Sequence, residues 1–323
     1  MPLSRRSLVL GSAAAFSLAA FGGGYAMGSY GEAMAAANAR ITGKSSLVTT
    51  RFGQLEYAVA GRGEPLLMVH GTGGGFDQGL RFAGGLIASG FQVVAPSRFG
   101  YLRSDFPDDP SPEHQADAFA ELLDHLGIDR IPIVGGSAGA LPAASFALRH
   151  PDRCSHLILL VPAMNLSNRD PVEFTRLQQF FVERLLTSDR WFWAARTWAP
   201  DQLIGTLLAT DPALLASVPA SERERAYLVL DELMPIHKRL QGMAQDGQMA
   251  GAPSGMDVSR IEMPALIVSA EDDRFGTAQA AQLLAGRIPS ARLVIFPTGG
   301  HLWLGHDEEL TAEITNFVAR PAG

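Results

Sequence analysis

The sequence predicts an α/β protein built on a mostly parallel, doubly wound sheet of eight strands. Three observations support this prediction. Short apolar runs alternate with helical patterns along most of the chain, and the first two runs follow one another closely, as in a hairpin. A long segment, 164–263, has helical periodicity and no convincing strand pattern. Alternating strands and helices require crossover connections, which place helices on both faces of a parallel sheet.

The eight strand-like runs are rich in Val, Ile, Leu, Phe and Ala and are bounded by Gly, Pro or polar residues. They span residues 47–51, 55–60, 65–69, 91–95, 131–134, 157–161, 265–269 and 292–296. Segment 164–263 therefore lies between the sixth and seventh strands. Within it, the glycine-containing stretch 247–255 is expected to be a loop that returns the chain to the sheet.

Length and composition favour one large domain with an insertion. The chain has 323 residues, of which 47% are hydrophobic and 18% charged, so it can bury a large core. We expect residues 40–163 to form the first part of that core and residues 264–323 the second part, with 164–263 as the helical insertion. Residues 1–39 have a different character and are treated apart.

The N-terminus has the pattern of an export signal. Ser4-Arg5-Arg6-Ser7 precedes a moderately apolar, Ala/Gly-rich stretch, as in twin-arginine signals, and small-x-small cleavage sites occur at 33–35 and 37–39. We expect export to the periplasm or beyond. The alternative is an uncleaved membrane anchor, because 8–27 is about 20 residues, or about 30 Å of helix.

Composition argues against several partners. A net charge of −7 provides no basic surface for nucleic acid. The chain has no Walker loop, no Cys/His cluster and a single cysteine, Cys154, so no intrachain disulfide can form. We expect a small-molecule substrate, no cofactor and no metal, with membrane contact only through an uncleaved N-terminal segment.

The most informative motif is Gly135-Gly136-Ser137-Ala138-Gly139, between a strand pattern and an Ala-rich helical pattern. A Gly-x-Ser-x-Gly turn between strand and helix is typical of a nucleophile elbow. Gly135 and Gly139 permit the tight turn, which exposes the Ser137 hydroxyl at a helix N-terminus. Gly136, with no side chain, leaves room beside the serine.

A serine nucleophile needs a base and a group that orients the base. His301 follows the strand 292–296 and a short loop, at the edge where open α/β sheets place their chemistry. His306 is the nearest rival, but the acidic residues 307–309 mark it as the start of the last helix. For the orienting acid, the strand 265–269 ends in Glu271, Asp272 and Asp273, of which at least two are bystanders.

In this order, the serine, the acid and the histidine with their strand contexts resemble the α/β-hydrolase superfamily. The resemblance extends from about residue 47 to the C-terminus. It implies that Asp273, three residues after Ala270, is the acid, with Asp272 as the alternative. It also implies that segment 164–263 is the cap that this superfamily inserts between strands 6 and 7.

The stretch His70 to Gly75 resembles the His-Gly loop that supplies an oxyanion donor in this superfamily. The match implies that the backbone amides of Thr72 and Ala138 form the oxyanion hole, with Gly73 as the alternative to Thr72. His70 is interpreted as structural. After the strand 91–95, the family often has Asp-x-x-Gly-x-Gly-x-Ser, whereas this chain has Ser97 and Leu102 at the first and sixth positions.

These residues predict a serine hydrolase of carboxylesterase type that acts through an acyl-enzyme. The alternatives are a carbon–carbon bond hydrolase or aminopeptidase of the same fold and, from another class, a non-catalytic binding protein. We expect an apolar substrate pocket beside Gly136 and Trp303, beneath an aromatic-rich cap. The aromatic residues of this cap are Phe174, Phe180, Phe181, Trp191, Phe192, Trp193 and Trp198.

Overall fold

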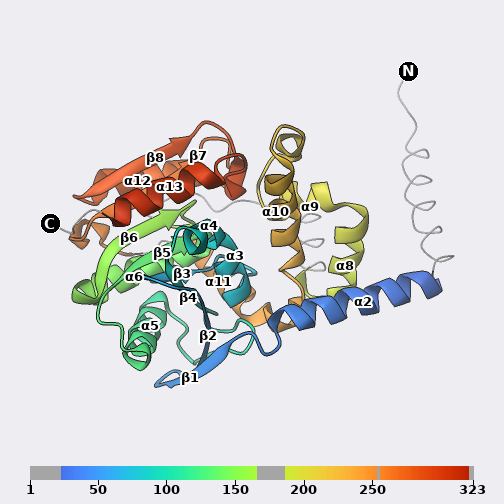
Figure 1. Ribbon diagram of the computed structural model, residues 1–323, viewed down its shortest axis with the longest axis horizontal. Helices are drawn as coiled ribbons and strands as arrows, with labels where there is room; N and C mark the ends of the chain where they lie inside the picture. The colour runs from blue at the N-terminus through green and yellow to red at the C-terminus, as the bar shows by residue number, and fades with distance from the viewer. Residues whose placement is uncertain (1–22, 166–185, 253–254, 320–323) are drawn as a thin grey trace.

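The computed structural model describes residues 23–165, 186–252 and 255–319, and its centre is one eight-stranded sheet (Figure 1). The strand order is β1-β2-β4-β3-β5-β6-β7-β8. Strand β2 runs antiparallel to both β1 and β4, and all other neighbours are parallel. The strands are β1 (Ser46–Thr50), β2 (Gly53–Gly61), β3 (Pro65–Val69), β4 (Gln92–Pro96), β5 (Ile131–Gly136), β6 (Cys154–Leu160), β7 (Ala265–Ala270) and β8 (Ala291–Phe296). The predicted fold class and all eight predicted strands are confirmed.

Helices cover both faces of the sheet. Those that pack on it or its edge are α3 (Phe76–Phe82), α4 (Gly84–Ala88), α5 (Pro112–Leu126), α6 (Ala140–Arg149), α12 (Thr277–Arg287) and α13 (Asp307–Val318). The apolar core on one face joins α5, α6 and α12, with Phe119 and Phe146 fully buried. The core on the other face joins α4 and α13 through Leu86 and Phe317. The central parallel strands are buried on both sides, which explains their continuous apolar sequences.

In the described residues between β6 and β7, helices are the only regular secondary structure, joined by turns and loops. This part of the chain contains α8 (Asp189–Trp198), α9 (Pro200–Leu207), α10 (Ala220–Asp231) and α11 (Leu240–Gly251). Helices α8, α9 and α10 lie to one side of the sheet (Figure 1) and share an apolar cluster that includes Phe192, Ile204 and Leu230. We refer to this helical part as the cap. Of its aromatic residues, Trp191 and Trp198 are 55% and 63% exposed, whereas Phe174, Phe180 and Phe181 lie outside the described residues.

Helix α11 corrects one expectation. The predicted loop at 247–255 is wrong in its first half, because α11 continues to Gly251. Its glycines are tolerated since the helix is fixed by tertiary contacts: Met243 and Asp246, three residues apart, are both buried.

Of the N-terminal signal or anchor predicted at 1–39, residues 1–22 lie outside the described residues. Helix α2 (Gly23–Ile41) follows them and contacts α8 of the cap, with the rings of Tyr30 and Trp193 5.6 Å apart. Within residues 23–165, 186–252 and 255–319, no helix combines the length and apolar character needed to cross a bilayer.

In the loop after β4, Ser97 and Leu102 occupy the two positions where the family often has Asp and Gly, and the structure shows how each is accommodated. The Ser97 hydroxyl donates to the Glu56 carboxylate of β2 at 2.9 Å and accepts the Phe76 amide at 3.0 Å, so β2 supplies the acidic group. Leu102 takes the left-handed conformation, with φ 54°, that a glycine would adopt without strain.

Candidate active site

The turn between β5 and α6 holds Ser137 in a strained conformation. Its φ is +51°, which L-residues rarely adopt. A Cβ at Gly135 would lie 2.5 Å from the Gly139 carbonyl oxygen, and one at Gly139 would lie 2.5 Å from the His70 carbonyl oxygen. Both positions therefore need glycine. The half-buried Ser137 side chain stands at the N-terminal end of α6, as the motif predicts.

The structure brings His301 to this serine. The imidazole Nε2 lies 2.9 Å from the Ser137 hydroxyl oxygen. His301 follows β8 in a short helical turn, Gly300–Leu302, and the chain enters that turn through Gly299 and Gly300 at φ 129° and 59°. The ring packs edge-on against Phe275, with centroids 5.0 Å apart, which fixes its plane. The alternative, His306, instead stacks on Phe296 and contacts Glu309 at the start of α13.

Asp273 lies on the other side of the imidazole. Its Oδ2 is 2.8 Å from Nδ1 of His301, and it also accepts the Thr277 hydroxyl; Oδ1 accepts the Phe275 amide at 2.9 Å. Burial by itself would raise the pKa of Asp273, but the adjacent His301 and the two donors outweigh burial and hold the pKa below its usual value. The carboxylate is thus ionised next to the imidazole.

The neighbouring Asp272 has different partners. Its carboxylate accepts the amides of Gly300 at 2.8 Å and Gly299 at 3.3 Å. It therefore fixes the loop that presents His301 and does not contact the imidazole. The geometry distinguishes the two aspartates that the sequence left as alternatives.

The loop after β3 lies directly against the serine. A Cβ on Gly71 would be 3.1 Å from Cβ of Ser137. The Gly73 amide already donates to the Tyr101 hydroxyl at 3.2 Å, whereas Thr72 is exposed. Of the two candidate donors in this loop, the geometry thus favours Thr72.

His70 is part of the scaffold beneath that loop. It is fully buried, its Nε2 accepts the Arg98 amide at 2.9 Å, and its Nδ1 lies 2.7 Å from the Gly71 carbonyl oxygen. Burial and the charge of Arg98 lower the pKa of His70 well below its usual value. A neutral ring with the proton on Nδ1 satisfies both contacts.

The two predicted pocket residues have different surroundings. A Cβ on Gly136 would meet only the Val69 carbonyl oxygen, at 3.9 Å, so there is space beside the serine. Trp303 does not fit the expectation of a cleft residue. It is 3% exposed, packs against Phe82 in the core and donates its indole N–H to Asp307. The chain turns away after His301, with φ 43° at Trp303 itself.

Three polar residues at the site were not anticipated from the sequence. Thr277 holds Asp273, and Tyr101 and Asp246 contact one another beneath the loop 70–73. Thr277 could have been suspected, because it is a polar residue at a helix start four positions after the acid. Asp246 carried no signal, since its partners are 145 and 148 residues away in sequence.

Comparison with known proteins agrees with this architecture. Residues 64–305 match the family model described as alpha/beta hydrolase fold. A 2-hydroxy-6-oxo-6-phenylhexa-2,4-dienoate hydrolase of Burkholderia cepacia is 29% identical over 251 residues, which cover 75% of this chain and 82% of that protein.

Two solved structures share the fold. An alpha/beta hydrolase fold protein from Nakamurella multipartita has a TM-score of 0.70 and 24% identity, covering 85% of this chain and 98% of its own. The enol-lactonase from Burkholderia xenovorans has a TM-score of 0.62 and 22% identity, covering 85% of this chain and all of its own. The match to the family model spans most of the chain, and the chain therefore belongs to the α/β hydrolase family.

Proposed function

We propose that Ser137, His301 and Asp273 act as a catalytic triad that hydrolyses a bond to a carbonyl carbon. The observation that supports this is the continuous pair of contacts from the Ser137 hydroxyl through His301 to Asp273, at 2.9 and 2.8 Å. Ser137 attacks the carbonyl carbon while Nε2 of His301 takes its proton, and the ionised Asp273 stabilises the resulting imidazolium.

The carbonyl oxygen becomes negative in this step, and the amides of Thr72 and Ala138 receive it. The intermediate then expels its leaving group, which takes the proton back from His301, and leaves an acyl group on Ser137. Water, deprotonated by the same imidazole, attacks this acyl-enzyme and releases a carboxylic acid.

For the bond that is broken, the relatives favour a carbon–carbon bond. The named substrate of the Burkholderia cepacia relative contains a ketone and a carboxylate but no ester or amide, so its hydrolysis must break a bond between carbons. The same substrate class is named for a relative from Comamonas testosteroni, 26% identical over 253 residues. We therefore propose carbon–carbon bond hydrolysis beside a ketone as the first candidate, ahead of the ester hydrolysis that the motifs suggested.

The two candidates differ in the leaving group that they require. An ester releases an alcohol, which His301 protonates directly. A ketone must release carbon as a carbanion, which is feasible only where a conjugated chain accepts the electron pair. A 2-hydroxy-6-oxo-2,4-dienoate provides such a chain once its 2-hydroxyl has lost a proton and C5 has gained one, because the electron pair released at C5 is then conjugated with the new 2-oxo group. A simple ketone has no such group.

The test compares three substrates with one enzyme. Loss of the conjugated chromophore of 2-hydroxy-6-oxo-6-phenylhexa-2,4-dienoate would support the first candidate, and faster turnover of p-nitrophenyl esters would support the second. Peptide substrates test the aminopeptidase alternative. A fluorophosphonate probe should label the wild-type protein and not Ser137→Ala. Equal labelling of both, or turnover by Ser137→Ala, would refute Ser137 as the nucleophile.

A further inference from the structure

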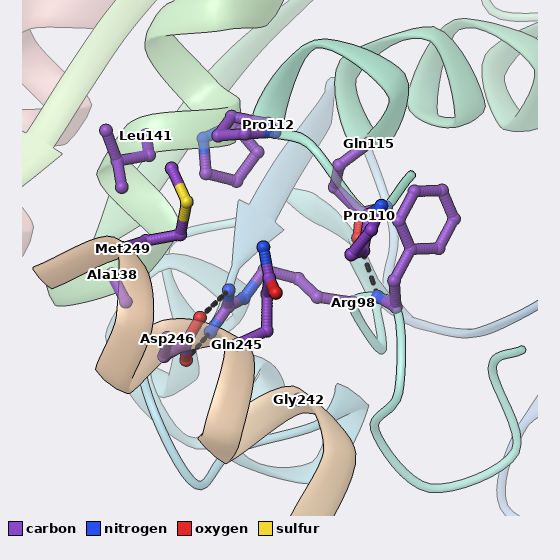
Figure 2. Close-up of a pocket in the computed structure, with 12 residues that line it drawn as sticks. Arg98, Pro110, Pro112, Gln115, Ala138, Leu141, Gly242, Gln245, Asp246 and Met249 are labelled. Carbon is purple, nitrogen blue, oxygen red and sulfur yellow. Dashed lines mark hydrogen bonds and ion pairs between the residues drawn. The ribbon is translucent and has the colours of Figure 1, made fainter. Parts of the chain in front are cut away.

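A buried polar network lies beneath the loop that carries Thr72. Arg98 forms a two-pronged ion pair with Asp246, with Nη1–Oδ1 at 2.7 Å and Nη2–Oδ2 at 2.6 Å (Figure 2). The Tyr101 hydroxyl donates to the same Asp246 carboxylate at 2.6 Å. All three side chains are at least nine-tenths buried. In such surroundings a fully paired network is rigid, because any displaced member would leave an unpaired buried group.

This network holds the loop 70–73 at three atoms. Arg98 donates from Nε to the His70 carbonyl oxygen at 3.0 Å and from its own amide to the His70 ring at 2.9 Å. The Tyr101 hydroxyl accepts the Gly73 amide at 3.2 Å. Thr72 lies between these fixed points, so the direction of its amide is set by the residues on either side.

Asp246 of this network belongs to α11, the last α-helix of the cap before β7. A Cβ on Gly242 of α11 would lie 2.1 Å from the Tyr101 ring, so this helix is in direct contact with the tyrosine. The Gly242 amide also donates to the Gly100 carbonyl oxygen at 3.1 Å. A shift of α11 would therefore move Tyr101, and with it Gly73.

We propose that Tyr101 and Asp246 are positioning residues that aim the Thr72 amide at the developing oxyanion, and that they couple its direction to the placement of helix α11. This inference rests on the proposed function for its catalytic consequence. It assigns a role to the loop after β4, where this chain departs from the family pattern.

The first test removes only the hydroxyl of Tyr101. In Tyr101→Phe, the Gly73 amide loses its acceptor, while Asp246 keeps Arg98. We expect kcat and the rate of fluorophosphonate labelling to fall about 10-fold, while KM stays within twofold of the wild-type value. This loss is smaller than that caused by removing an oxyanion donor itself, which lowers kcat about 100-fold or more. Tyr227→Phe is the control, because it removes a tyrosine hydroxyl that also donates to an aspartate, Asp201 in the cap at 2.7 Å, away from the loop 70–73.

The second test changes a residue of α11 and leaves Tyr101 itself intact. Gly242→Ala must displace the Tyr101 ring, whereas Gly247→Ala, in the same helix, meets nothing within 4 Å. Both gain the same helix propensity. Only Gly242→Ala should slow labelling of Ser137 and accelerate amide hydrogen exchange in residues 71–75.

The outcomes separate this inference from the proposed function. If the wild-type protein is neither labelled nor active, the proposed function fails, and hydrogen exchange alone decides whether α11 positions the loop. Unchanged exchange in both Tyr101→Phe and Gly242→Ala would overturn the inference. So would faster exchange with a labelling rate within twofold of wild type, since the loop would then be held without consequence for the chemistry.

Discussion

Asp272 accepts the backbone amide of Gly300 at 2.8 Å, so the residue before Asp273 in sequence holds the loop on which His301 lies. The two adjacent carboxylates thus position the same histidine through different contacts. One contacts the imidazole, and the other fixes the backbone one residue before it. This division leads to a graded expectation for their variants.

Asp273→Asn should lower kcat about 10,000-fold, because an amide in this place favours the wrong imidazole tautomer and cannot stabilise the imidazolium. Asp272→Asn keeps an oxygen that can accept the Gly300 amide, so we expect a loss of about 10-fold or less, together with about 1 kcal/mol of stability. Steady-state kinetics and urea unfolding of both variants measure these effects. A larger kcat loss in Asp272→Asn would reverse the assignment of the acid.

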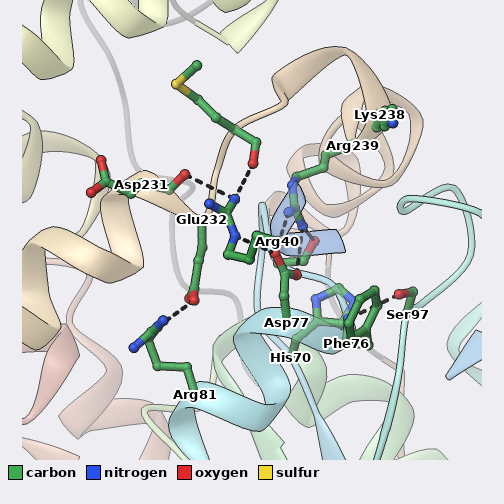
Figure 3. Close-up of polar contacts among 12 residues, drawn as sticks. Arg40, His70, Phe76, Asp77, Arg81, Ser97, Asp231, Glu232, Lys238 and Arg239 are labelled. Atoms are coloured by element: carbon green, nitrogen blue, oxygen red, sulfur yellow. Dashed lines mark hydrogen bonds and ion pairs between the residues drawn. The ribbon is translucent and has the colours of Figure 1, made fainter. Parts of the chain in front are cut away.

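A buried glutamate predicts how stability depends on pH. Glu232 at the end of α10 is 2% exposed and is paired with Arg81, near Asp77 and Arg40 (Figure 3). Burial, despite the opposing charge of Arg81 and with help from Asp77, raises the pKa of Glu232 from 4.5 to about 7. The folded protein therefore holds this proton at pH values where the unfolded chain has lost it.

A raised carboxyl pKa contributes stability that is complete below pH 4.5 and is lost as pH rises through about 7. The contribution of Glu232 to the free energy of unfolding should accordingly fall by about 3 kcal/mol over this window. Glu232→Gln has no proton to lose, so its stability relative to wild type should rise between pH 5 and pH 8 in urea titrations. The exposed Glu308→Gln is the control. A difference that does not change with pH would show that Glu232 is ionised in the folded protein throughout.

The sequence predicted the sheet well because apolar runs bounded by turn residues are local signals. It predicted the places of Ser137 and His301 for the same reason, since Ser137 directly follows one strand and His301 follows another after a short loop. The continuation of α11 to Gly251 and the role of Asp246 could not be predicted, because they depend on tertiary contacts such as those of Asp246 with Arg98 and Tyr101, which are far away in sequence. Trp303 was misplaced for a related reason: proximity to His301 along the chain does not fix the side on which a turn directs a side chain.

The N-terminal motif leads to a prediction about location. We propose that Arg5 and Arg6 direct export, because the guanidinium pair rather than its charge is the recognised feature. The double exchange Arg5→Lys with Arg6→Lys should leave the protein in the cytoplasm, and the single exchange Arg62→Lys should have no effect. Cell fractionation with immunodetection measures the distribution. Normal export of the double variant, or an intact N-terminus on exported protein, would refute a cleaved twin-arginine signal.

The space beside Ser137 predicts a contrast between two adjacent glycines. Gly136 has an extended backbone, with φ −93°, and a Cβ there would contact only the Val69 carbonyl oxygen at 3.9 Å, so Gly136→Ala should fold normally. We expect the same space to accept the branched side chain of Gly136→Val. A Cβ on Gly135 would lie 2.7 Å from Cβ of Ala143, so Gly135→Ala should lose about 3 kcal/mol or more.

If the free space at Gly136 receives the acyl part of the substrate, filling it should affect large acyl groups first. Each methylene in an apolar pocket changes the transition-state energy by about 1 to 3 kcal/mol, so the loss should grow with acyl length. For Gly136→Val we expect kcat/KM to fall about 10-fold or more for long-chain substrates and by less than about threefold for the smallest, which kinetics on a graded acyl series would measure. An equal loss at every length would place the substrate elsewhere, because a side chain that merely disturbs the elbow slows Ser137 toward all substrates alike.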